Sequence, residues 1–120
     1  MRLKKPTMHE LSIVTGIIDI AVREAEKAGA TLVEEIELDI GCLTTVEMMA
    51  FDLAWKQAVK GTILESCVTT VNRIAGKARC LDCETLFELE QLYDPCPGCG
   101  GHLLDIQDGK QLRVRSLIVS

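Results

Sequence analysis

The spacing of apolar residues along the chain predicts an amphipathic helix near its amino end. Between residues 10 and 28, apolar side chains recur every three or four positions, which places them on one face of a helix. Glu10 lies at the positive end of the expected helix dipole, Lys27 lies at its negative end, and Gly29 is a typical stop.

A second helix is expected within residues 46–61. Thr44 and Glu47 have the spacing of a capping box, in which each side chain binds a free backbone N–H group at the helix start. Gly61 follows the apolar pattern and favours a helix end at that point.

Three further segments predict β-strands. Apolar and acidic residues alternate along residues 34–41, which is typical of a half-buried strand with acids such as Asp39 on the face away from the core. Residues 67–74 are rich in β-branched side chains, and residues 112–119 predict a third strand. We therefore expect an α+β fold in which two helices pack on a small three-stranded sheet.

Two Cys-x-x-Cys pairs are the main candidates for chemistry; they consist of Cys80, Cys83, Cys96 and Cys99. A tight turn directs both sulfurs of such a pair toward one ion, and two turns complete the tetrahedral four-thiolate shell of structural zinc. Proline and glycine near the second pair favour a turn, and residues 86–93 between the pairs are suited to a small hairpin. We expect a zinc-ribbon-like module at residues 76–104, inserted between the second and third strands.

Disulfides, a redox-active pair and an iron–sulfur cluster are the alternatives to zinc. A reducing cytoplasm disfavours disulfides, and a redox pair is normally single and follows a strand. An iron–sulfur cluster can use the same thiolates, so the spacing leaves it open. Beside these thiolates we expect His102 to be exposed rather than a ligand, and we expect the isolated Cys42 and Cys67 to lie in the core.

Composition narrows the class of protein. The formal net charge is −5 and the basic residues are dispersed, which opposes binding to nucleic-acid phosphates. No apolar run has the length of a membrane span and no secretory signal follows the basic start, so we expect a cytoplasmic protein. A closed shell of four cysteine thiolates leaves no position for a substrate, and no catalytic motif accompanies it, so we expect neither an enzyme nor catalytic residues.

Three motifs occur in order along the chain: "MHELS" at residues 8–12, "DIGCLTTVE" at residues 39–47, and the Cys-x-x-Cys pairs ending in "CPGCG". Together with the β-rich end they resemble the HypA/HybF family of hydrogenase nickel-incorporation proteins over residues 8–119. The resemblance implies a nickel metallochaperone with a structural zinc. It would bind Ni(II) at its Met-His-Glu end and help to insert the ion into the [NiFe]-hydrogenase large subunit.

The resemblance also implies which residues bind each metal. His9 matches the nickel-binding histidine of the family, with Met8 as its initiator residue and Glu10 as the accompanying acid. The four paired cysteines match the zinc ligands of the family. Nickel(II) favours nitrogen and oxygen donors, and the imidazole, carboxylate and backbone nitrogens at the helix start supply both kinds.

The implied domains are a nickel-binding α/β domain at residues 8–75 plus 105–120, a zinc-binding domain at residues 76–104, and an N-terminal extension at residues 1–7. The implied partners are the hydrogenase large subunit, the GTPase HypB and, for some members, urease maturation proteins. A homodimer is compatible with the resemblance, whereas nucleic acid and membrane are not expected partners. The alternative function is a zinc-ribbon module that binds protein or nucleic acid and delivers no nickel.

Overall fold

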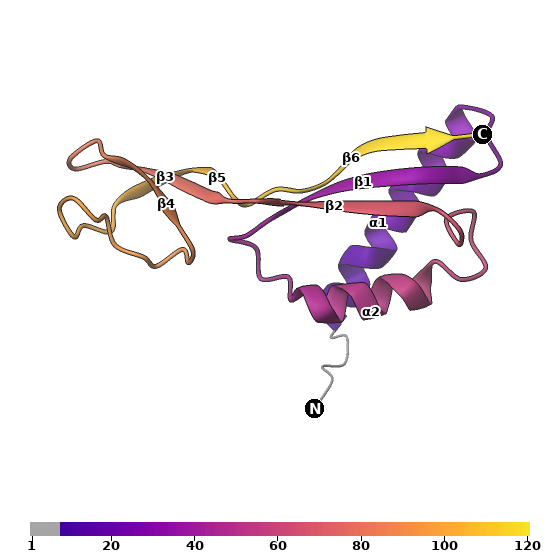
Figure 1. Cartoon of the computed structure of the whole chain (residues 1–120), viewed down its shortest axis with the longest axis horizontal. Coiled ribbons are helices and arrows are strands. Elements are labelled where there is room, and N and C mark those ends of the chain that lie inside the picture. Colours follow the sequence, from indigo (N-terminus) through magenta and orange to yellow (C-terminus); the bar gives the residue numbers. More distant parts are fainter. Residues whose placement is uncertain (1–7) are drawn as a thin grey trace. The chain divides into compact units, whose positions relative to one another are not determined.

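The computed structural model describes residues 8–120, with side chains described from Glu10 onward. Its elements are, in order, α1 (Met8–Lys27), β1 (Val33–Gly41), α2 (Met48–Ala58), β2 (Val68–Ile74), β3 (Gly76–Cys80), β4 (Leu86–Leu89), β5 (Leu104–Asp108) and β6 (Leu112–Val119) (Figure 1). The strands form two three-stranded sheets, ordered β2-β1-β6 and β4-β3-β5. The predicted α+β fold, with two helices, a small sheet and a cysteine-containing module, is confirmed.

The described residues divide into two compact units. The helical unit contains residues 8–38, Thr45–Thr70 and Val114–Ser120, and the cysteine unit contains Asp39–Thr44 and Val71–Arg113. The division falls inside β1, β2 and β6, so each of these strands contributes residues to both units. The sequence predicted three strands, whereas residues 8–120 form six, because β3, β4 and β5 build a sheet of their own.

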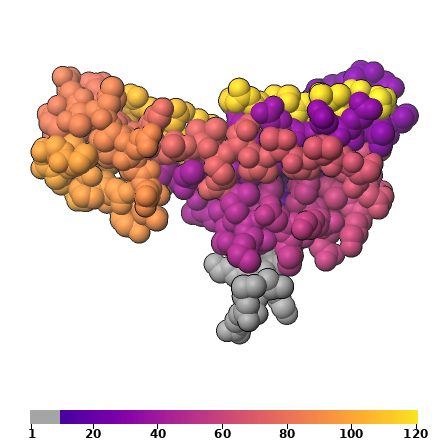
Figure 2. Space-filling model, in the orientation of Figure 1, coloured from indigo at the N-terminus to yellow at the C-terminus, as the bar shows by residue number. Residues whose placement is uncertain are grey.

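The helical unit has its own apolar core. Its buried apolar residues, none more than 7% exposed, are Val14, Ile17, Ile18, Ala21, Ala25, Val33, Ile36, Leu38, Val46, Ala50, Phe51, Ala54, Trp55, Val59 and Leu64. They come from the predicted face of α1, from β1, and from α2 and its flanking loops. The outer strand β6, yellow in Figure 2, lies at the surface of the molecule.

The start of α2 differs from the predicted capping box. Glu47 is itself the N-cap, and its carboxylate accepts hydrogen bonds from the N–H groups of Met49 at 3.3 Å and Ala50 at 2.8 Å. The Thr44 hydroxyl instead donates to the carbonyl oxygen of Gly41 at 2.8 Å. One carboxylate with two oxygens satisfies both free donors, so the helix begins with an acid at its positive end.

The acidic side of β1 includes a fully buried carboxylate, Asp39, which the sequence placed away from the core. Its side chain accepts hydrogen bonds from Asn72 Nδ2 at 3.0 Å and from Arg113 Nε at 2.9 Å. Asn72 lies on β2 and Arg113 lies on β6, the two neighbours of β1 in the sheet. Burial of a charge is tolerated here because both flanking strands supply donors to it.

The cysteine unit contains a much smaller core. Leu43, Ala78 and Leu89 are buried, and Phe87, Leu104 and Ile106 pack against them. The predicted hairpin within residues 86–93 is wrong, because β4 pairs with β3 and leaves the rest of the segment as a turn. In that turn the Asp94 carboxylate accepts hydrogen bonds from the N–H groups of Glu90 and Gln91.

No helix among residues 8–120 combines the length and apolar character that crossing a lipid bilayer requires.

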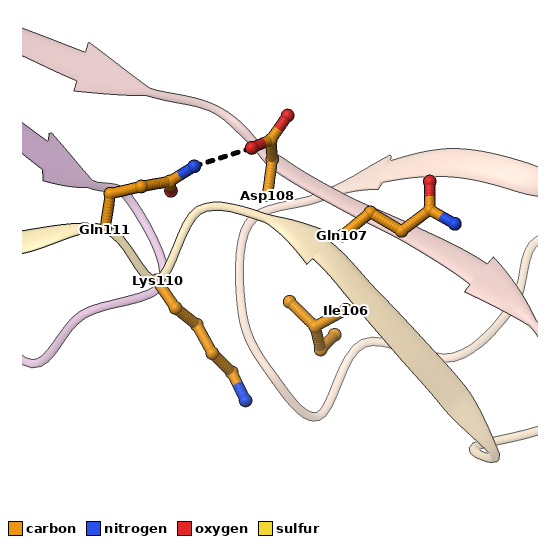
Figure 3. Close-up of a pocket in the computed structure, with 5 residues that line it drawn as sticks. All are labelled: Ile106, Gln107, Asp108, Lys110 and Gln111. Atoms are coloured by element: carbon orange, nitrogen blue, oxygen red, sulfur yellow. Dashed lines mark hydrogen bonds between the residues drawn. The ribbon is translucent and has the colours of Figure 1, made fainter.

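A close backbone approach fixes the turn between β5 and β6. Figure 3 shows Gln111 donating a hydrogen bond to Asp108, and Gly109 between them has a positive φ of 107°. Leu43 N–H donates to the carbonyl oxygen of Gly109 at 2.8 Å, and Gly41 N–H donates to that of Gln111 at 2.7 Å. The end of β1 therefore lies directly against the turn, at a separation that only glycine at position 41 permits.

We predict that Gly41→Ala destabilises the folded chain by about 3 kcal/mol or more. A Cβ atom at position 41 would overlap the backbone carbonyl of Gly109 and lie 2.8 Å from the nitrogen of Lys110. The matched control is Gly16→Ala in α1, where an added Cβ meets nothing within 4 Å. That change should stabilise the helix by roughly 0.5–1 kcal/mol. Denaturant unfolding of the metal-loaded variants measures both values; equal effects of the two substitutions would contradict the close approach.

Candidate metal centre

The first cysteine pair lies on the turn that joins β3 to β4. Cys80 ends β3, its N–H group donates to the carbonyl oxygen of Thr85 at 2.9 Å, and its own carbonyl accepts from Glu84 N–H at 2.9 Å. Glu84 has a φ of 64°, in the left-handed region that closes such a turn. The chain therefore reverses within a few residues, and Cys83 lies inside the bend.

The second pair lies on a turn with the same hydrogen-bond pattern. Cys96 N–H donates to the carbonyl oxygen of Gly101 at 2.8 Å, and its carbonyl accepts from Gly100 N–H at 2.8 Å. Here the residue with positive φ is Gly100, at 73°. Glycine adopts this conformation without strain, which explains the glycine-rich sequence after the second pair.

The two turns bring all four sulfurs together. Every pair of the four Sγ atoms lies within 4.8 Å, with Cys80 and Cys99 at 3.6 Å and Cys83 and Cys96 at 3.5 Å. A tetrahedral zinc ion with Zn–S bonds of about 2.3 Å separates its sulfurs by roughly 3.8 Å. The cluster therefore has the donor set and size that one zinc ion needs, and all six cysteines of the chain are free thiols.

Hydrogen bonds from neighbouring residues also reach the sulfurs. The Thr85 hydroxyl lies 3.1 Å from Cys83 Sγ, and Gly98 N–H donates to Cys96 Sγ at 3.3 Å. A Cβ atom at Gly98 would lie 3.0 Å from the Thr85 hydroxyl and 3.6 Å from the sulfurs of Cys83 and Cys96. The absence of a side chain at Gly98 thus allows the backbone and the hydroxyl to approach the thiols.

These contacts give the two exposed thiols, Cys83 and Cys99, different pKa values. Hydrogen bonds from the hydroxyl and N–H groups of Thr85 lower the pKa of Cys83 to about 6. The Gly101 N–H group also favours the thiolate of Cys99, but hydrogen bonds with Cys80 and Cys83 raise the Cys99 pKa to about 12. A metal ion must displace the remaining protons, so metal affinity should increase as the pH rises.

The predicted nickel ligands lie at the start of α1. Met8 and His9 belong to its first turn, although their side chains lie outside those that the structure describes. Glu10 is nearly buried, with 4% of its surface exposed.

The remaining cysteines and the second histidine lie outside the cluster. His102 is exposed, as expected. Cys42 is exposed and Cys67 only partly buried, so their predicted place in the core is wrong. In the part of the chain with described side chains, only the four paired cysteines form a group of three or more potential metal ligands.

Comparisons with known proteins agree with this arrangement. The model of the family described as hydrogenase/urease nickel incorporation, metallochaperone, hypA matches residues 8–119. Hydrogenase maturation factor HypA of Parabacteroides distasonis is 43% identical over 112 residues, which are 93% of this chain and 97% of that protein. The factor of the same name from Rhizobium leguminosarum bv. viciae is 36% identical over 93% of this chain and 99% of its own length.

Two solved structures share the fold. The solution structure of the nickel metallochaperone HypA from Helicobacter pylori has a TM-score of 0.66 at 21% identity, over 92% of this chain and 96% of that one. A second solution structure of a HypA protein has a TM-score of 0.68 at 23% identity, over 95% and 98% of the two chains. On the family match and the curated relatives, this chain belongs to the HypA family of hydrogenase and urease nickel-incorporation metallochaperones.

Proposed function

We propose that this protein is a nickel metallochaperone that binds Ni(II) at its Met-His-Glu end and helps to insert it into the [NiFe]-hydrogenase large subunit. The observation that carries the proposal is the family match, which begins at Met8 and therefore includes the whole motif. The description of the family names nickel incorporation, and the curated relatives are hydrogenase maturation factors.

The start of α1 is suited to a site that releases its cargo. His9 supplies an imidazole and a backbone nitrogen, and Met8 supplies the preceding backbone group, all of which are donors that Ni(II) accepts. Because Glu10 is almost completely buried, it anchors this first turn, and we assign His9 as the principal ligand with Glu10 as the accompanying acid. A site with so few protein ligands at a helix end can lose nickel without unfolding the core of the helical unit.

The four paired cysteines would hold a structural zinc ion. Four thiolates complete a tetrahedral shell and leave no position for water or substrate, so the ion would cross-link the two turns. Two of the thiols, Cys80 and Cys96, are buried, while Cys83 and Cys99 are exposed. The hydrogen bonds from Thr85 and Gly98 would offset part of the negative charge on the thiolates.

The remaining assignments follow from this proposal. The chain would act as a carrier and not as an enzyme, with the hydrogenase large subunit and a nickel-pathway GTPase of the HypB kind as partners. Urease maturation proteins and a second copy of the chain are further proposed partners, and the cytoplasm is the proposed location. The expected boundaries of the nickel-binding and zinc-binding domains stay predictions. A zinc-ribbon module without nickel delivery is the alternative, and nickel binding decides between the two.

The first prediction from this proposal concerns zinc. The purified chain should contain about one zinc ion per molecule, and Cys96→Ser should lose it because three thiolates bind far more weakly than four. The control is Cys42→Ser, which removes an exposed cysteine of the same unit that lies outside the cluster. Elemental analysis of the purified proteins measures the content. Full zinc retention by the Cys96 variant would disprove the assignment.

The second prediction concerns nickel. His9→Ala should lower nickel affinity at least about tenfold, since the imidazole is the strongest donor in the motif, and should leave the zinc content unchanged. The chain contains one other histidine, His102, which makes His102→Ala a matched control with wild-type affinity expected. Titration calorimetry of the zinc-loaded proteins with Ni(II) measures both. If the two variants bind nickel equally well, His9 is not the ligand and the alternative function gains support.

A further inference from the structure

The four thiols of the cysteine cluster differ in their access to solvent. Cys80 and Cys96 are buried, whereas Cys83 and Cys99 are exposed. A competing chelator or an alkylating reagent reaches the exposed pair first. Exchange of a bound zinc ion would therefore begin at Cys83 or at Cys99, and the surroundings of these two sulfurs decide between them.

Those surroundings are unequal. The Thr85 hydroxyl lies 3.1 Å from Cys83 Sγ and can donate a hydrogen bond to the thiolate. Each exposed sulfur also accepts a backbone hydrogen bond, Cys83 from Thr85 N–H and Cys99 from Gly101 N–H. Each also contacts a second sulfur, Cys83 with Cys96 at 3.5 Å and Cys99 with Cys80 at 3.6 Å. The Thr85 hydroxyl therefore gives the Cys83 thiolate one more hydrogen bond than the Cys99 thiolate receives.

The position of the hydroxyl is fixed by both turns of the cluster. The Thr85 carbonyl oxygen accepts a hydrogen bond from Cys80 N–H at 2.9 Å, which ties the residue to the first turn. From the second turn, Gly98 leaves room over the hydroxyl, because a Cβ atom there would approach it to 3.0 Å. Thr85 is thus held between the turns with its hydroxyl directed at Cys83.

We propose that Thr85 is a positioning residue of the zinc centre, whose hydroxyl retains the exposed Cys83 thiolate on the metal and leaves Cys99 as the first thiolate to exchange. This inference rests on the proposed zinc site. Removing a group that hydrogen-bonds to a metal ligand typically lowers metal affinity by about 10–100-fold.

The test uses the zinc-loaded full chain with Thr85→Val and Thr85→Ser. Valine keeps the shape of the side chain and the backbone N–H but removes the hydroxyl, and serine keeps the hydroxyl. Zinc transfer to a chromogenic chelator should be about tenfold faster or more in Thr85→Val and near the wild-type rate in Thr85→Ser. A Thr85→Val chain that binds no zinc, while Thr85→Ser binds one ion, would support the same role.

Limited alkylation by iodoacetamide followed by peptide mass spectrometry identifies the first thiolate to leave. Cys99 should be modified first in the wild type and in Thr85→Ser, and Cys83 should react as early in Thr85→Val. If Thr85→Val releases zinc at the wild-type rate and is alkylated in the wild-type order, the inference is wrong although the zinc site is retained. The same holds if Thr85→Ser releases zinc as fast as Thr85→Val. A wild-type chain without zinc would overturn the zinc site and this inference together.

Discussion

The convergence of four cysteine sulfurs is the constraint on which the cysteine unit depends. Besides two cysteines, its buried apolar residues are only Ile40, Leu43, Ala78 and Leu89, and the three strands of its sheet have only four or five residues each. A core of this size does not offset the conformational entropy of the turns around it. Metal–thiolate bonds can contribute on the order of 10–16 kcal/mol of apparent folding free energy in small modules. The two cysteine turns therefore account for the fold of the unit as well as for its metal chemistry.

The helical unit has an apolar core large enough to fold without a metal ion. Its core draws on both helices and on β1, so it does not rely on a metal ion to fold. The proposed nickel site lies at the start of α1, where a nickel ion could bind and dissociate while the rest of the helix stays packed. Under the proposed assignment, one chain would combine a closed shell that retains its zinc ion with a helix end that releases nickel, because the two sites would differ in their number of protein ligands.

Local patterns made part of this arrangement predictable. Helical spacing located α1, alternation located β1, and the cysteine spacing located the cluster, because each depends on residues close together in sequence. The sequence-based predictions that were wrong concern contacts between residues far apart in the sequence, which no local pattern encodes. Asp39 is buried because β2 and β6 supply its donors, and residues 86–93 do not form a hairpin because β4 pairs with β3. Thr85 follows Cys83 by two residues, but the contact of its hydroxyl with the Cys83 sulfur depends on the geometry of the turn, which the sequence does not show.

Metal–thiolate bonding should therefore fold the cysteine unit, while the helical unit, with the proposed nickel site, should be stable without it. Hydrogen exchange with mass spectrometry, on the zinc-loaded chain and on the same chain after chelation, tests this most directly. Amides of β3, β4 and β5 should lose protection on zinc removal, whereas those of α1 and the first half of β1 should retain it. Unchanged protection of β3–β5 would show that the cysteine unit folds without the metal, and equal loss in α1 would show that the helical unit depends on it.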